Sequence, residues 1–563
     1  MCRFSFFILT TLFLPIFVVF SVHAGPVNDQ TFQKIESSLI EIIKPNSDYA
    51  NEEIPSYPAW TRALTADWLK YNPDAVADAS NPDCSSKKWW ETYRKAPTQP
   101  ISQAINEYLR RCDKQIQSGW SALPITGYLT AMVRLDLPRH PYGRFVMLHF
   151  PNGNQLKGYL ALKGDGVKRP LIVIRLGIFS NLSQFLPEKF MFLQLFEQSL
   201  FNVLVLESSS SNEYIFRNKT LAMGGFDEGI QNFLLAKKLQ DPAEPISKVV
   251  EDVHLAAMSF GGHGAMFASL LSELEARRNK TNSAPVIKSV LTYCPLLNFR
   301  STMDFHLNQG IQSAGFDYWV SQRLHGVEKV IPEIDEKHFV KSMSAWLDKN
   351  YQGPSAFDES LPLNEEMKTN LKKFWIENQF WSYYKDVKTP VLILATESDS
   401  FVPFDLNSYL VLNKSIELGN SPVQVVPLQA GMHCDLPGSY LWRPLTTIAQ
   451  SFFLQQSDFK PEKVIREVPL SVDEFNKLKS ISFPPKYTLQ EGNNLSEFIL
   501  NLEISAWPTV TKRILFSLKD LGYGESDFIR SKLMVERWLT QNLHFELAEG
   551  ALSSAELKLS WYR

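Results

Sequence analysis

Residues 253–264, Val-His-Leu-Ala-Ala-Met-Ser-Phe-Gly-Gly-His-Gly, decide the fold of this chain. The apolar run from Val249 to Ala257, interrupted by three polar residues, predicts a buried strand. Ser259 comes next, and the apolar run from Ala265 to Leu271 predicts a helix. Small residues near the serine let strand and helix approach at a sharp turn: Gly261, Gly262 and Gly264. A serine on a strained turn of this kind is a nucleophile elbow, and the helix N-terminus beneath it favours developing negative charge.

The elbow departs from its usual pattern at one position. The usual pattern is Gly-x-Ser-x-Gly, and Ala257 stands in place of the first glycine. Alanine is the smallest change that a side chain could introduce there. The alternative interpretation is a glycine-rich strand-to-helix turn in which the serine is incidental.

The composition is that of an ordinary globular protein. The chain has 563 residues, 44% hydrophobic and 21% charged, which is enough for two or three domains. The net charge is −3, so no overall basic field favours nucleic acid, and we expect no nucleic-acid partner. The sequence shows no repeat of fixed period, and it leaves the oligomeric state open.

The first residues predict export. Arg3 is the only charge before Asp29, an apolar run covers residues 4–22, and Val22-His23-Ala24 has the pattern of a cleavage site. We therefore expect a signal peptide over residues 1–24, cleavage after Ala24, and a periplasmic or extracellular protein. An uncleaved membrane anchor is the alternative. No later segment is apolar for long enough to predict a membrane span.

The cysteines agree with export. Four remain after signal cleavage, and of their three possible pairings we expect Cys84 with Cys112, because both lie in the same segment. Cys294 and Cys434 could equally be free buried thiols. No Cys-x-x-Cys pair occurs, so we expect neither a thiol-rich metal site nor a redox motif.

The middle of the chain alternates apolar strands with helices. A predicted hairpin (145–150 and 156–162) is followed by apolar runs at 170–174, 201–206, 249–257, 286–293, 390–395 and 423–428. A predicted helix covers 226–239. This alternation indicates an α/β protein with a parallel sheet covered on both faces.

The chain divides into four parts by pattern. The signal peptide precedes a mostly helical segment at 25–137, in which Phe32, Ile35, Leu39 and Ile42-Ile43 recur at helical spacing. The α/β domain covers 138–457 and contains an aromatic-rich helical insertion at 297–388. That insertion is interpreted as a lid over the ligand crevice, or as a plain extra helical layer. Residues 458–563 predict a small accessory α+β domain.

A serine nucleophile needs a base and a group that orients the base, and the strand order supplies both. Asp399 follows the strand at 391–394, and His433 follows the strand at 423–428. Ser259, Asp399 and His433 therefore each stand at the carboxyl end of a predicted strand. Other candidates near them are Glu397 and Asp405 for the acid, His263 for the base, and Asp435 as a rim charge.

An oxyanion hole needs two backbone N–H groups directed at the developing charge. One should come from Phe260, directly after the serine. The other should come from Ile178, because Gly177 lets the loop after the strand at 170–174 approach closely. Arg175 lies near this loop, where it binds an acidic substrate group or pairs with Glu207; we expect the pairing.

These residues together resemble the α/β-hydrolase family over about 144–453. The resemblance rests on the elbow at Ser259, the Gly177 loop, Asp399 and His433. It implies a mostly parallel eight-stranded sheet, acyl transfer through an acyl-enzyme, no cofactor and no metal. Besides Ala257, Leu176 departs from the family, since many members have histidine there.

The function that this resemblance implies is that of an exported serine hydrolase. We expect a carboxylic ester as the small-molecule substrate, and the aromatic-rich insertion favours an apolar acyl or aryl group. One alternative is a serine peptidase of the prolyl-oligopeptidase-like type, which the missing propeller repeat disfavours. The other is a non-catalytic binding protein on the same fold.

Overall fold

The computed structural model of the chain describes twenty stretches, which include the whole central sheet. They are residues 29–43, 100–112, 137, 140–175, 177–182, 191–220, 225–278, 284–308, 317–318, 320–350, 362–363, 379–419, 421–428, 433, 443–481, 485–494, 496–506, 509–525, 528–549 and 555–563. The predicted signal peptide and Cys84 of the expected disulfide lie outside these residues. Among the described helices, none combines the length and the apolar character that crossing a bilayer requires.

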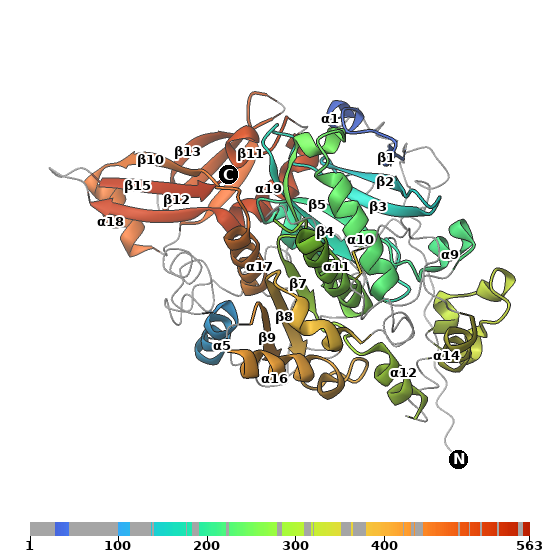
Figure 1. The fold of residues 1–563 in the computed structure, drawn as a ribbon. Helices are drawn as coiled ribbons and strands as arrows, with labels where there is room; N and C mark the ends of the chain where they lie inside the picture. Colours follow the sequence, from blue (N-terminus) through green and yellow to red (C-terminus); the bar gives the residue numbers. More distant parts are fainter. Residues whose placement is uncertain are drawn as a thin grey trace, which may run out of the picture.

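A nine-stranded sheet organises the molecule (Figure 1). Its spatial order is β1-β2-β3-β5-β4-β6-β7-β8-β9. The strands are β1 (Ile40–Ile42), β2 (Gly143–His149), β3 (Gln155–Ala161), β4 (Arg169–Arg175), β5 (Asn202–Leu206), β6 (Val250–Met258), β7 (Val290–Tyr293), β8 (Val391–Thr396) and β9 (Val423–Leu428). The six strands from β5 to β9 in this order pair in parallel, and β1, β2 and β3 join one edge as antiparallel strands. The predicted mostly parallel sheet is confirmed, with one strand more than expected.

The additional strand corrects the reading of the N-terminal segment. Helix α1 covers only Asp29–Gln33, and residues 40–42 form β1, which pairs with β2. The helical prediction for these residues was therefore wrong. Their apolar spacing fits a strand equally well, and the backbone groups of β2 at the sheet edge decided between the two.

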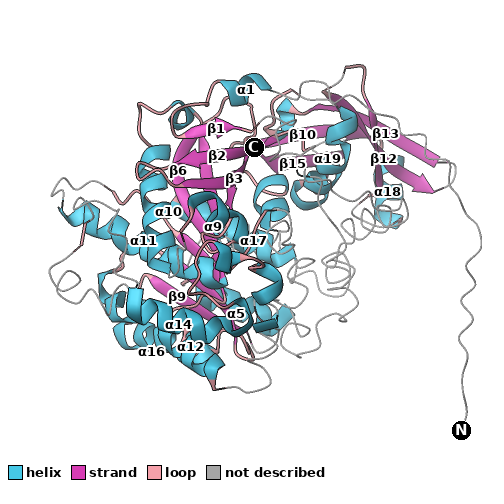
Figure 2. Ribbon diagram, turned by 90° about the vertical axis from the view of Figure 1, so that its right-hand side faces the viewer, coloured by secondary structure: helices cyan, strands magenta, loops and turns pink. Residues whose placement is uncertain are grey.

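Side chains of the central strands alternate between two apolar layers. On β4, Leu171 and Val173 belong to one buried cluster, and Ile172 and Ile174 belong to the other. Helices α10 (Gly225–Leu239) and α11 (Ser259–Arg278) pack in the first layer against β6 (Figure 2). The second layer includes α5 (Ile101–Cys112) and α17 (Arg443–Gln456). Burial on both faces explains why these strands are continuously apolar.

The described parts of the predicted insertion are mostly helical. They comprise α12 (Phe299–Leu307), α14 (Phe339–Asn350) and the short helices η5 (Val327–Lys329), η6 (Glu336–His338) and η8 (Phe380–Asp386). Two other helices border the sheet, α9 (Asn212–Asn218) and α16 (Ser408–Leu418). The Phe339 ring of α14 meets the Phe179 ring edge-on at 5.0 Å, so the insertion reaches the loop after β4.

The C-terminal region forms two three-stranded sheets beside the central one (Figure 1). They contain β10 (Lys463–Leu470), β14 (His544–Glu549), β15 (Ala555–Tyr562), β11 (Tyr487–Glu491), β12 (Glu497–Ala506) and β13 (Thr509–Ser517), with helices α18 (Val472–Ser480) and α19 (Phe528–Asn542). Buried Lys163 links this region to the core, since its Nζ donates to the Tyr523 hydroxyl at 2.6 Å. Burial holds the pKa of Lys163 well below its usual range.

We predict that Gly262→Ala destabilises the protein. A methyl group at this position would lie 2.4 Å from Thr292 Oγ1 and 2.8 Å from Pro295 Cβ. Overpacking of this kind costs about 1–3 kcal/mol, which exceeds the gain of about 1 kcal/mol that alanine brings to a helix interior. Chemical denaturation should show a lower free energy of unfolding, whereas exposed Lys238→Ala should stay within about 0.5 kcal/mol of the parent. An unchanged Gly262→Ala value would contradict the close packing of strand and helix.

Candidate active site

Ser259 stands at the turn between β6 and α11, in a backbone conformation that side chains rarely adopt. It is the first residue of α11, and its φ is +52°. A non-glycine residue in this region costs about 1–3 kcal/mol, so the surrounding structure must hold it there. Two close contacts hold the serine in this conformation, because they keep α11 against its neighbours. Gly262 packs on Pro295, and Gly264 packs on Glu228. The turn therefore places Ser259 at the carboxyl edge of the sheet, where 8% of its surface is exposed.

Ser259, His433 and Asp399 form one hydrogen-bonded row. His433 Nε2 lies 2.8 Å from Ser259 Oγ, and His433 Nδ1 lies 2.8 Å from Asp399 Oδ2. A carboxylate only accepts hydrogen bonds, so Nδ1 carries the imidazole proton and Nε2 accepts from the serine hydroxyl. The structure thus brings together three residues that the sequence places 140 and 34 positions apart, in the tautomer that a base needs.

The carboxylate of Asp399 is itself held in place. Its other oxygen, Oδ1, accepts the backbone N–H groups of Phe401 and Val402, both at 2.8 Å. Its side chain is 1% exposed, whereas that of His433 is 22% exposed. The carboxylate therefore points at the imidazole from a fixed position, and the imidazole remains open to solvent on one side.

The pKa of His433 is raised above its ordinary value. Burial by itself lowers this pKa, because it penalises the charged imidazolium, but the hydrogen bond and the negative charge of Asp399 outweigh it. Nearby His306 shows the opposite result, because burial lowers its pKa. His306 Nε2 contacts the Phe401 carbonyl at 2.8 Å, and the Phe401 ring lies 5.6 Å from the His433 ring. Of these two histidines, the surroundings therefore favour the charged imidazolium at His433 and disfavour it at His306.

The loop after β4 approaches the serine closely. A Cβ on Gly177 would lie 3.5 Å from Ser259 Cβ and 4.0 Å from Ser259 Oγ, so the loop passes beside the hydroxyl. Ile178 follows Gly177, and Phe260 lies in the first turn of α11, where backbone N–H groups have no acceptor within the helix. Both expected oxyanion donors therefore belong to segments that border Ser259.

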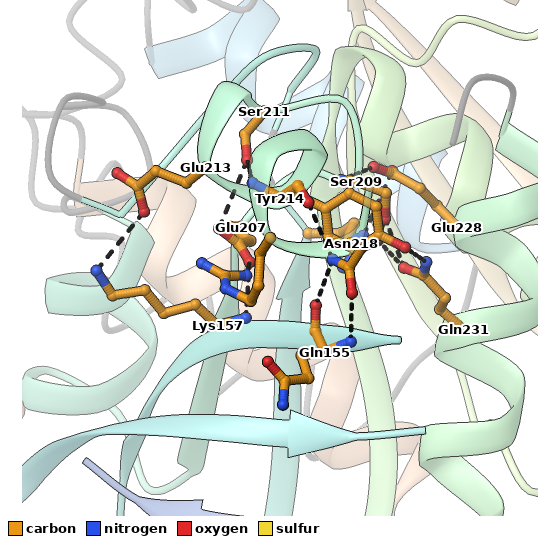
Figure 3. Close-up of polar contacts among 12 residues, drawn as sticks. Gln155, Lys157, Glu207, Ser209, Ser211, Glu213, Tyr214, Asn218, Glu228 and Gln231 are labelled. Atoms are coloured by element: carbon orange, nitrogen blue, oxygen red, sulfur yellow. Dashed lines mark hydrogen bonds and ion pairs between the residues drawn. The ribbon is translucent and has the colours of Figure 1, made fainter. Parts of the chain in front are cut away.

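A polar network after β5 supports this loop. Phe179 has a φ of +58°, and its N–H donates to Ser210 Oγ at 3.0 Å. The Ser208 N–H donates to the Ser180 carbonyl at 2.9 Å. Glu228 of α10 accepts from the Ser208 hydroxyl and from the Ser209 N–H, as Figure 3 shows for Glu228 and Ser209. The serines at 208–210 thus connect the loop after β4 to helix α10.

Arg175 belongs to the same network, and its predicted partner was wrong. It forms a buried ion pair with Glu228 at 3.3 Å and donates to Gln231 Oε1 at 2.6 Å. Glu207 instead pairs with Arg217 and accepts the Lys157 N–H at 2.7 Å (Figure 3). The strand register explains the difference. Arg175 on β4 pairs with Leu206 on β5, so Glu207 lies one residue beyond this pair and contacts β3, which is on the other side of β5. Arg175 is fully buried, so it is not placed to bind a substrate acid.

The described alternatives for the acid and the base, His263, Glu397 and Asp405, are not part of the hydrogen-bonded row. His263 is buried within α11 and packs on the Phe267 ring at 4.9 Å. Glu397 and Asp405 are exposed, whereas Asp399 is buried. Asp435 and Leu176 lie outside the described residues.

Cys294 lies next to this site, and the sequence analysis did not predict that position. It follows β7 directly, is buried and belongs to no disulfide. Its sulfur, an oxygen of Asp399 and a ring nitrogen of His433 all lie within 4.8 Å of one another. The available signal was its position at the end of the strand between those that carry Ser259 and Asp399. Ser210 and Glu228 were missed as well, because no sequence motif marks a supporting residue.

Comparisons with known proteins add structural likeness only. No protein-family model matches the chain, and no curated protein sequence matches it. The dipeptidyl peptidase 4 structure of Porphyromonas gingivalis is 12% identical with a TM-score of 0.33, over 56% of this chain and 36% of that one. An acylaminoacyl peptidase of Pyrococcus horikoshii is 13% identical with a TM-score of 0.33, over 61% and 45%. An esterase of Pyrococcus furiosus is 12% identical with a TM-score of 0.35, over 56% and 91%.

The chain spans less than half the length of either peptidase. Likeness at these values carries no conclusion about activity, so the fold is assigned from the chain's own architecture. That architecture is a mostly parallel sheet with an antiparallel edge, a strained serine between a central strand and its helix, and an acid and a histidine after the last two strands. The chain has the α/β-hydrolase fold.

Proposed function

We propose that this protein is a serine hydrolase that cleaves carboxylic esters through an acyl-enzyme. The observation that carries the proposal is the row Ser259–His433–Asp399, with 2.8 Å at each hydrogen bond. A buried carboxylate, an imidazole in the matching tautomer and a strained serine at a helix N-terminus are the parts that nucleophilic acyl transfer requires.

The proposed reaction follows from this geometry. His433 Nε2 takes the Ser259 proton as Oγ attacks the acyl carbon, and Asp399 stabilises the imidazolium that forms. The N–H groups of Ile178 and Phe260 stabilise the oxyanion. His433 then returns the proton to the leaving alcohol. Water, activated by the same imidazole, attacks the acyl-enzyme and releases the acid.

Aromatic side chains near the row support an apolar acyl or aryl group. Phe401 is 40% exposed and its ring adjoins His433, and the centroid of the Phe299 ring of α12 lies 5.9 Å from that of Phe260. Helices α12 and α14 of the insertion thus contact both segments proposed for the oxyanion hole, which supports the lid interpretation. The proposal also includes export of the chain after removal of residues 1–24.

We predict that Ser259→Ala abolishes labelling by a fluorophosphonate probe and lowers kcat for p-nitrophenyl esters by about 10⁶-fold, because the attacking oxygen is lost. Gel fluorescence and ester hydrolysis measure the two effects. Ser269→Ala on the same helix is the matched control, since Ser269 Oγ only donates to the Met266 carbonyl, and it should keep both activities. Labelling that persists in Ser259→Ala would refute the assignment. Faster cleavage of aminoacyl anilides than of esters would identify a peptidase instead.

The raised pKa of His433 predicts the pH dependence. Only the neutral imidazole accepts the serine proton, so kcat/KM should rise with pH, with its midpoint above the ordinary histidine value of about 6.5. Asp399→Asn removes the charge that raises the pKa, so the midpoint should move to lower pH and kcat should fall by roughly 10⁴-fold. Initial rates between pH 5 and 9, about the range in which histidine titrates, measure both effects. An Asp399→Asn profile that keeps the parental midpoint would contradict the pairing.

Ser210 is predicted to act as a positioning residue. Ser210→Ala removes the acceptor of the Phe179 N–H and loosens the loop that carries Ile178. We expect kcat to fall by about tenfold with little change in KM, a fraction of the 10²–10³ that a lost oxyanion donor costs. Stopped-flow measurement of acylation isolates this step. Ser199→Ala is the control, because Ser199 bonds only the Gln194 carbonyl. An equal loss in both variants would point to a general stability effect.

A further inference from the structure

We propose that Cys294, Asp399 and His433 form an inhibitory binding site for a thiophilic divalent cation such as Zn²⁺. The site is a consequence of where β7, β8 and β9 end, and it stands on the coordinates of these three side chains. Its effect on catalysis rests on the proposed function.

The three ligand atoms already lie close together. The Cys294 sulfur, a carboxylate oxygen of Asp399 and a nitrogen of His433 lie within 4.8 Å of one another. In a tetrahedral zinc site with bonds of about 2.0–2.3 Å, neighbouring ligand atoms are roughly 3.3–3.7 Å apart. The cation can therefore be accommodated by side-chain shifts of about 1 Å, without movement of the sheet.

The backbone holds Cys294 in this position. Its N–H donates to the Leu394 carbonyl at 2.8 Å, which fastens it to β8, and its φ is +44°. Asp399 is fixed by its two backbone hydrogen bonds, and His433 leaves a partly exposed path into the site. The backbones of Cys294 and Asp399 are thus held in place while their side chains can adjust, and the partly exposed His433 admits the cation from solvent.

The donor set selects a borderline or soft cation. Thiolate, imidazole and carboxylate together suit Zn²⁺ or Cd²⁺, whereas Mg²⁺ and Ca²⁺ prefer oxygen ligands alone. Binding releases the Cys294 thiol proton to water and forms a metal–thiolate bond. His433 binds as neutral imidazole, with its one proton on the nitrogen that does not hold the cation. A water molecule completes the fourth position.

A cation bound at this site prevents His433 from acting as the proposed base, whichever ring nitrogen it binds. If the cation binds Nε2, that nitrogen no longer accepts the Ser259 proton. If it binds Nδ1, the imidazole proton moves to Nε2, which then also cannot accept. The Asp399 carboxylate, shared with the cation, no longer stabilises an imidazolium. Inhibition should therefore lower kcat and be reversed by a chelator.

The first experiment titrates Zn²⁺ against ester hydrolysis by the full chain, with each variant compared with its own uninhibited rate. We expect Cys294→Ala and Cys294→Ser to raise the half-inhibiting Zn²⁺ concentration at least tenfold. His338→Gln is the control, because exposed His338 lies 2.9 Å from Asp335 and offers an alternative surface site. His338→Gln should leave the half-inhibiting Zn²⁺ concentration unchanged, and EDTA should restore ester hydrolysis. Equal Zn²⁺ sensitivity in the Cys294 variants and the parent would overturn the proposal.

The second experiment measures binding without catalysis. Cd²⁺ is added to Ser259→Ala, which keeps all three ligands, and the thiolate-to-cadmium charge-transfer absorbance is recorded in the ultraviolet. We expect a band with one equivalent of Cd²⁺ that the double variant Ser259→Ala/Cys294→Ser lacks. The band would support the site even if no ester is hydrolysed, so failure of the proposed function is distinguishable. The same band in both proteins would assign the binding to another cysteine and refute the site.

Discussion

The strained backbone at Ser259 is the constraint on which the rest of the structure depends. A serine at φ +52° persists only if the strand before it and the helix after it are held too close for a relaxed turn. Gly262 and Gly264 permit that approach, because any side chain there would overlap Thr292, Pro295 or Glu228. The packing of two apolar layers against the central strands supplies the stabilisation that offsets this strain.

The same constraint organises the site around the serine. The close approach at Gly264 sets α10 and α11 together, and α10 brings Glu228 to the buried Arg175 and to the serines after β5. Those serines hold the loop at 177–180 beside the Ser259 hydroxyl. Ser259 after β6 and the loop after the neighbouring strand β4 are therefore parts of one packed unit. An unpaired charge in this unit would be costly, which is why Arg175 and Glu228 occur together.

Much of the sheet could be predicted from the sequence, because burial on both faces leaves continuous apolar runs that end at turn residues. The hairpin at β2 and β3 and the strands β4, β5, β6, β8 and β9 lie where those runs are. The segment at 40–42 could not be predicted in this way, because a short apolar run fits both helix and strand. The partner of Arg175 was also beyond sequence reasoning, because it depends on which helix crosses the end of β4.

The sequence by itself determined the elements, their order and the positions of Ser259, Asp399 and His433 at strand ends, because periodicity and turn chemistry act over a few residues. Only the tertiary structure decided which side chains meet. The 2.8 Å contacts of His433, the support of Phe179 by Ser210 and the position of Cys294 beside Asp399 depend on strand register and helix packing. These join residues far apart along the chain, and no local pattern records the distance between them.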